Sequence, residues 1–318
     1  MNPPAFTHRV IHGLREADYH ADRLGIGDLP PSLSSNAGKL LLSHSPLHAW
    51  HAHPRLNPDW QPDDPAKFDL GKAVHALLLD DRPERVVIID AADYKASAAK
   101  AARDTAIADG KLPLLTAKYE TAMAIVHAAR DAIPRFAEGA DFIDGDSEVT
   151  LVWEEPGGVV CRMRIDRLAK NHTHMFDVKT EGESAHPDAF ANKITRLGYD
   201  FSAAFYLRGF RKCFPSLPAP QWSWLAIETE PPHGVSLTGM DAAGLAIADQ
   251  EVEIAIAIWR ECLRTGTWPG YPHKKRIIET KPWALASHEQ LSARIGFKSP
   301  SDSQAIRDMI FKWQAPIN

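Results

Sequence analysis

Two acids and a lysine stand at short spacing between Cys161 and Lys179. The segment reads as two short strands joined by a polar turn, and side chains alternate between the two faces of a strand. Asp177 and Lys179 therefore share one face, and Asp166 stands eleven residues earlier on the hairpin partner. We expect the three side chains to lie close together.

Carboxylates at this spacing suit Mg²⁺ or Mn²⁺, which prefer oxygen ligands. A lysine two residues after an acid can orient or deprotonate a water molecule and offset phosphate charge. The alternative is a surface ion pair between Asp177 and Lys179, worth under about 1 kcal/mol. Their strand is otherwise apolar, which favours a site for metal-dependent phosphodiester hydrolysis.

Two residues upstream extend this set. Glu148 begins the strand that precedes Asp166, and His75 lies on a helix expected from about Lys67 to Leu79. Gly71 precedes His75 by one helical turn and leaves room beside the imidazole. A lone histidine of this kind is more often a core residue, so its role depends on the acids.

The elements that must position these residues follow from periodicity. Apolar residues that recur with the period of a helix predict helices, and apolar residues that alternate with a period of two predict strands. Expected helices are 67–79, 93–108, 115–133, 185–197, 199–214 and 241–265, and expected strands are 85–90, 147–155, 159–169, 174–180, 221–229 and 234–240. This order predicts an α/β fold with a small mixed sheet flanked by helices.

Composition limits the class of protein. The chain has 318 residues, 44% of them apolar, and a net charge of −5. It lacks an apolar run of ~18 residues and an N-terminal apolar segment, so we expect no membrane span and a cytoplasmic location. Three scattered cysteines do not form a cluster site. Nucleic acid would have to be bound through local cations or metal ions.

Four histidines crowd the segment 44–53, but no acid or cysteine stands near them, so a solvated cluster is favoured over a metal site. Trp222 and Trp224 are expected in the core, and Trp50 and Trp60 are candidates for stacking on bases.

Several motifs together resemble the PD-(D/E)xK nuclease superfamily, in particular its exodeoxyribonuclease VIII (RecE-like) branch of phage type. They stand in the family's order over about residues 32–230: LSSNAGKLLLSHSPLHAW, LGKAVHALLL, EVTLVW, CRMRIDRL, MFDVKT and GYDFSAAFYLRGF. The resemblance implies a restriction-endonuclease-like core at 67–240. A helical and loop extension would occupy 1–66, and a long helix with a basic tail packed on the core would occupy 241–318.

The same resemblance implies the roles of the site residues. His75, Asp166, Asp177 and the Val178 carbonyl would bind one or two Mg²⁺ or Mn²⁺ ions. Lys179 would be the catalytic lysine, assisted by Glu148.

DNA would be bound by cations near these strands and on the two following helices, without sequence preference. The family's Q-x-x-x-Y pattern appears here with Ser202 in place of the glutamine and with Tyr206 retained, and the shorter serine puts the helix's substrate contact in question. The residues expected to contact DNA are Arg162, Arg164, Lys193, Arg196, Ser202, Tyr206 and Arg208, with Arg211 and Lys212 nearby.

By resemblance the chain would be a 5′-to-3′ exonuclease on linear duplex DNA that acts in recombination as an oligomer, with a single-strand annealing protein as partner. Two alternatives stay open. One is an exonuclease of the helicase-nuclease or CRISPR-adaptation type without an iron–sulfur cluster. The other is a protein of the same fold that binds metal or DNA without catalysis.

Overall fold

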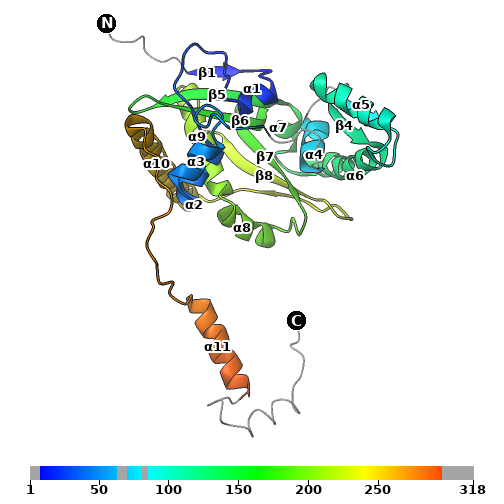
Figure 1. The fold of residues 1–318 in the computed structure, drawn as a ribbon. Coiled ribbons are helices and arrows are strands. Elements are labelled where there is room, and N and C mark those ends of the chain that lie inside the picture. The colour runs from blue at the N-terminus through cyan, green and yellow to red at the C-terminus, as the bar shows by residue number, and fades with distance from the viewer. Residues whose placement is uncertain (1–7, 63–69, 80–84, 296–318) are drawn as a thin grey trace. The chain divides into compact units, whose positions relative to one another are not determined.

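The computed structural model describes residues 8–62, 70–79 and 85–295 (Figure 1). The chain divides into two compact units, Met1–Tyr271 and Pro272–Asn318. The first unit joins the predicted N-terminal extension, the predicted core and the long helix. The second contains one described helix, and the predicted packing of the basic tail on the core stays a prediction.

A mixed sheet organises the first unit. Its strands follow the order β1-β5-β6-β7-β8-β9, and β2 pairs with β6 beside this path. The pairs are antiparallel except β7 with β8 and β2 with β6. The strands are β1 (Arg9–Ile11), β2 (Leu33–Ser34), β5 (Gly145–Glu155), β6 (Val159–Ala169), β7 (His174–Glu181), β8 (Gln221–Glu228) and β9 (Val235–Thr238), and a separate parallel pair is β3 (Val86–Ile89) with β4 (Leu112–Leu115).

Helices cover both faces of this sheet, which confirms the predicted α/β class. The described helices of the first unit are α1 (Glu16–His20), α2 (Ser35–Ser43), α3 (Pro46–Ala52), α4 (Leu70–Leu79), α5 (Ser97–Ala108), α6 (Thr116–Ala132), α7 (Gly139–Ile143), α8 (Pro187–Arg196), α9 (Tyr199–Cys213) and α10 (Ala242–Thr265), with a 3₁₀ turn at Ile133–Arg135. The second unit contains α11 (Pro282–Ile295). In the described part of the chain, none of these helices is both long enough and apolar enough to span a membrane.

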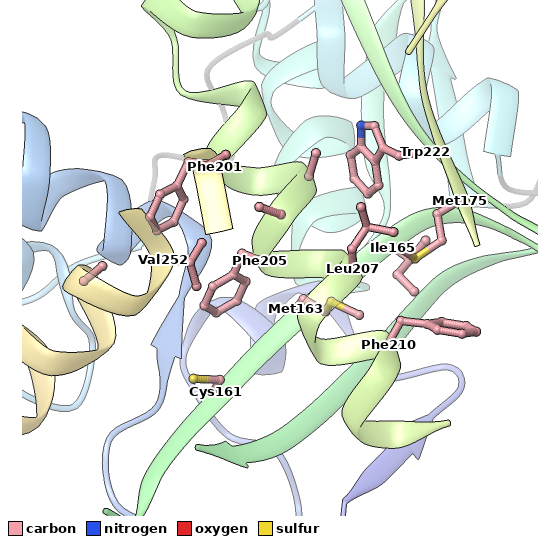
Figure 2. Packing of buried hydrophobic residues seen from close by; sticks show 14 of the residues in the cluster. Cys161, Met163, Ile165, Met175, Phe201, Phe205, Leu207, Phe210, Trp222 and Val252 are labelled. Atoms are coloured by element: carbon pink, nitrogen blue, oxygen red, sulfur yellow. The ribbon is translucent and has the colours of Figure 1, made fainter. Parts of the chain in front are cut away.

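The alternation along β6 and β7 separates two hydrophobic cores. Met163 and Ile165 of β6 face the core formed with α2, α8, α9 and α10, and Leu207 of α9 lies beside them (Figure 2). On the opposite face, Val178 of β7 packs in the core that contains α4 and α6. The polar residues of these strands must therefore lie where the covering helices leave room.

The N-terminal segment belongs to the sheet instead of standing outside it, because β1 pairs with β5 and β2 pairs with β6. A buried polar network holds it there. The guanidinium of Arg162 donates to the Asp22 carboxylate at 3.0 Å and to the Ser32 carbonyl at 2.7 Å. His53 also reaches the Ser32 carbonyl, with its Nε2 atom 3.0 Å away, so this histidine has a structural role.

Helix α9 approaches β5 closely because Gly209 has no side chain. A Cβ atom at this position would lie 2.6 Å from the Trp153 ring, which is completely buried. Contacts under 3.0 Å force either the ring or the helix to move. The glycine therefore sets the distance between this helix and the sheet.

We expect Gly209→Val to lower the free energy of unfolding by about 3 kcal/mol, because it overpacks a rigid part of the core. The measurement is urea unfolding. The matched control is Gly182→Val, at a position where an added Cβ meets no atom within 4 Å. The control should change stability by less than about 0.5 kcal/mol. Equal effects of the two substitutions would contradict the packing argument.

Candidate active site

The ladder between β6 and β7 opens at the two aspartates. Pairing is limited to Arg167 with Phe176 and Leu168 with Met175. One residue further, the Asp166 carboxylate accepts the backbone N–H of Val178 at 2.8 Å. A side chain thus replaces the next backbone hydrogen bond, and the strands separate where the site is expected.

The ladder between β5 and β6 is interrupted at the same level. Ser147 pairs with Arg167 and Val149 pairs with Ile165, but Glu148 between them has no ladder partner. Its φ of +58° is in the left-handed region. For a residue other than glycine this conformation costs about 1–3 kcal/mol and is concentrated at functional sites. The backbone of β5 is therefore distorted beside Asp166.

His75 of α4 lies between the two acids. Its Nε2 atom is 3.1 Å from the Asp166 carboxylate, and its Nδ1 atom is 3.3 Å from the Glu148 carboxylate. One ligand atom from each of these three residues falls within 4.8 Å of the others. Residues from a helix and two strands thus converge on one point.

Asp177 and Lys179 form a pair beside this group. The Lys179 ammonium is 2.5 Å from the Asp177 carboxylate, and it lies 5.0 Å from the centre of the Tyr199 ring. Both residues stand on the face of β7 opposite Val178, as their spacing predicts. The structure therefore brings together all five predicted side chains, with Asp166 between the histidine and the Asp177–Lys179 pair.

Comparisons with known proteins agree with this geometry. Residues 42–280 match the family described as a PDDEXK-like domain of unknown function. This match covers most of the chain. The chain belongs to this family.

A solved structure shares the fold at low sequence identity. A protein of Eubacterium rectale described as "Putative exonuclease" superposes with a TM-score of 0.55 and 11% identity, covering 87% of this chain and 98% of its own. The structure of SSO0001 matches with a TM-score of 0.27 and 14% identity, covering 59% of this chain and 84% of its own. No curated protein matches the sequence. The family match and this shared fold together confirm the predicted restriction-endonuclease-like fold.

The pKa values of the three carboxyl groups in this PDDEXK-like domain are shifted from their ordinary values. Burial raises the pKa of Asp177 to about 6, although Lys179 opposes the change and Asp166 adds to it. Burial also raises the pKa of Glu148. Burial also favours a higher pKa for Asp166. The interaction with His75 outweighs this effect, so the pKa of Asp166 is below its ordinary value. Two of the three carboxylates therefore resist ionisation in the absence of a cation.

The two bases carry the compensating charge. Burial lowers the pKa of His75, but the Asp166 and Glu148 carboxylates outweigh it and raise the value to about 9. Burial likewise opposes the charge of Lys179, and Asp177 and Asp166 raise its pKa above the ordinary value. Without metal, both groups are protonated at neutral pH.

This donor set fits a divalent cation. Imidazole nitrogen and carboxylate oxygens suit Mn²⁺, and the carboxylates suit Mg²⁺. A cation among His75, Glu148 and Asp166 would replace the proton on the imidazole and relieve the repulsion between the acids. PDDEXK nucleases generally use such ions, which agrees with this cluster. The role of Asp177 and the Val178 carbonyl as further ligands stays a prediction.

Most of the cations expected at the DNA have partners inside the protein. Arg162 belongs to the buried network with Asp22. Lys193 is 2.5 Å from the Glu181 carboxylate, and Arg208 donates to Glu155 at 2.9 Å. These side chains are buried or half-buried and have a structural role in the protein without DNA, and their contact with phosphate stays a prediction. The reason for their burial is that each side chain lies on a face of its strand or helix that is turned toward the interior of the protein.

Arg164 also turns inward, but toward the site. Its guanidinium is 3.2 Å from the Glu148 carboxylate, donates to the Leu14 carbonyl and lies 4.9 Å from the Tyr19 ring centre. It therefore holds Glu148 in place and connects the N-terminal segment to the site. The sequence contains no signal for this, because Leu14 and Tyr19 are about 150 residues away.

The predicted DNA contacts Ser202 and Tyr206 on α9 also have partners inside the protein, whereas Arg196 on α8 is exposed. The hydroxyl of Ser202 donates to the Gly198 carbonyl at 3.3 Å within its own helix. Tyr206 packs edge-on against Trp222, with ring centres 5.6 Å apart, and burial raises the pKa of its hydroxyl. Arg196 is exposed at the end of α8 and remains a predicted DNA contact.

The raised pKa of His75 predicts a pH effect on stability without metal. Its value of about 9 exceeds the ordinary value of 6.5, so the charged imidazole stabilises the folded state fully below pH 6.5. This contribution is lost as the pH rises from 6.5 through 9. In EDTA, the difference in free energy of unfolding between wild type and His75→Gln should therefore shrink over this range. A constant difference in urea unfolding would contradict the ion pair.

Proposed function

We propose that this protein is a metal-dependent deoxyribonuclease. The observation that carries the proposal is the convergence of His75, Glu148 and Asp166 beside the Asp177–Lys179 pair, at the point where the β6–β7 ladder opens. A divalent ion bound there would activate water and stabilise charge on the phosphate. Membership in the PDDEXK-like family supports this chemistry.

The chain's own residues have distinct tasks in this proposal. Lys179 is protonated and anchored by Asp177, so it serves as a fixed positive charge facing the phosphate instead of a base. Glu148 and Asp166 hold the cation. Arg164 and the backbone N–H of Val178 orient those two carboxylates.

We further propose an exonuclease that resects linear duplex DNA from 5′ to 3′ in recombination, acting in the cytoplasm as an oligomer with an annealing protein. The description of the Eubacterium rectale protein as "Putative exonuclease" supports the exonuclease part. The net charge of −5 agrees with a protein that contacts DNA only within a limited basic region.

Linear duplexes labelled at the 5′ or the 3′ end, and a closed circular duplex, test these statements. With Mg²⁺ or Mn²⁺ we expect early release of the 5′ label, no cleavage of the circle and no activity in EDTA. Lys179→Met should reduce the rate by roughly 100-fold or more, because it removes a fixed charge from the reacting phosphate.

Lys170→Met is the matched control. This exposed lysine pairs with Asp144 on a turn, and its replacement changes the net charge equally. It should keep the wild-type rate. Wild type that binds DNA without cleaving it under any metal would favour the silent alternative, and early release of the 3′ label would reverse the proposed polarity.

Metal binding should displace the proton from His75. Calorimetric titration with Mn²⁺ at neutral pH, in buffers of different ionisation enthalpy, should show release of about one proton per ion. The release should disappear in His75→Gln. Equal proton release by the variant would exclude the imidazole as the group that the cation replaces.

A further inference from the structure

Helices α2 and α9 pack unusually closely near the site because two glycines face the opposing helix. A Cβ on Gly38 of α2 would lie 2.6 Å from the Phe201 ring of α9. Conversely, a Cβ on Gly198, which precedes α9, would lie 2.8 Å from Cδ of Lys39. The alkyl chain of Lys39 therefore crosses the start of α9 at Gly198.

This position places Lys39 beside the catalytic pair. Gly198 is followed directly by Tyr199, whose ring lies under the Lys179 ammonium at 5.0 Å. The charge of Lys39 interacts with Lys179, Asp177 and Asp200. The side chain of Lys39 on α2 thus lies one residue along the chain from Tyr199, whose ring contacts Lys179 of β7.

Among the described residues, Lys39 differs from the paired cations of the sheet and its helices because it has no partner. Within residues 8–62, 70–79 and 85–295, its ammonium makes no hydrogen bond or ion pair. By contrast, Arg162, Arg164, Lys193 and Arg208 are all paired with acids.

An unpaired, half-buried charge next to a like charge is costly. Burial lowers the pKa of Lys39, and Lys179 lowers it further, while Asp177 and Asp200 only partly compensate. The folded protein therefore maintains a positive charge here at a loss of stability. An anion in front of the two ammonium groups would reverse this loss.

We propose that Lys39 binds a phosphate of the DNA strand next to the phosphodiester that is cleaved. The proposal rests on the nuclease function above and adds a substrate contact to it. The phosphate oxygens accept from the Lys39 ammonium, while Lys179 faces the reacting phosphate. Lys39 adds one phosphate contact to those that the sequence predicts.

Lys39→Met removes the charge and keeps the alkyl chain that packs on Gly198. Binding of a fluorescein-labelled linear duplex is measured by anisotropy in EDTA between about 50 and 200 mM salt. We expect about tenfold weaker binding at low salt. The slope of log K against log salt should fall in magnitude by about 0.7–0.9, the value of one phosphate contact. In Mn²⁺ the KM should rise by a similar factor with a smaller change in kcat.

The matched control is Lys100→Met. Lys100 is an exposed residue on α5, which packs on β3 and β4, and its loss changes the net charge equally. The salt slope and the KM of this variant should equal those of the wild type. Lys39→Arg, which keeps a positive charge, should retain most of the affinity.

Thermal unfolding without DNA separates a binding role from a structural one. Because the charge of Lys39 is unfavourable in the free protein, Lys39→Met should unfold at the same or a higher temperature than wild type. A lysine that served the fold would instead lower the unfolding temperature when replaced.

The outcomes distinguish the two proposals. If wild type cleaves DNA and Lys39→Met shows the wild-type salt slope and KM, the Lys39 contact is wrong and the nuclease function stands. A marked drop in the unfolding temperature of Lys39→Met would also overturn it. If wild type neither binds nor cleaves DNA, the nuclease function itself fails, and the phosphate site fails with it.

Discussion

The hydrogen bond from the Val178 N–H to the Asp166 carboxylate is the constraint on which the site depends. It ends the regular β6–β7 ladder after two residue pairs and lets the strands separate. A backbone group that lost its ladder partner in a buried place would cost free energy, and the carboxylate supplies the replacement acceptor. The same carboxylate then faces His75, so the opening of the sheet and the charge of the site have one origin.

The strands that pair along one edge of β6 explain why the sheet opens at Asp166. The edge of β6 away from β5 is paired with β2 at Cys161 and Arg162, and with β7 at Arg167 and Leu168. In the described part of the chain, the residues between these contacts are not paired on that edge. The short strand β2 and the brief pairing with β7 therefore leave a gap, and Asp166 lies at its end.

The positively charged residues of the first unit differ in what they contact. Two arginines of β6 point into the protein. Arg162 holds the N-terminal segment, and Arg164 holds Glu148. An arginine can make several hydrogen bonds at once, which suits it to such junctions. Close to the site, Lys179 of β7 is paired with Asp177, whereas Lys39 of α2 has no ion-pair partner among the described residues. These two lysines are the proposed contacts to phosphate. The acidic net charge of the chain is therefore compatible with a local cationic region.

The sequence by itself determined the strands β5 to β8, the helices that cover them and the identity of the five central side chains. It could do so because alternation and capping are local. The Asp241 side chain caps α10 by accepting the Gly244 N–H, and Asp177 and Lys179 share a face because a strand repeats every two residues. Strands β1 and β2 were not predictable, since two or three residues carry no periodicity. Only the tertiary structure decided which cations are paired inside the protein. Arg162 and Arg164 bind backbone carbonyls that lie 130 and 150 residues away, and the Lys39 side chain packs on Gly198 only because this glycine has no side chain. Such pairings depend on long-range packing, which no local pattern encodes.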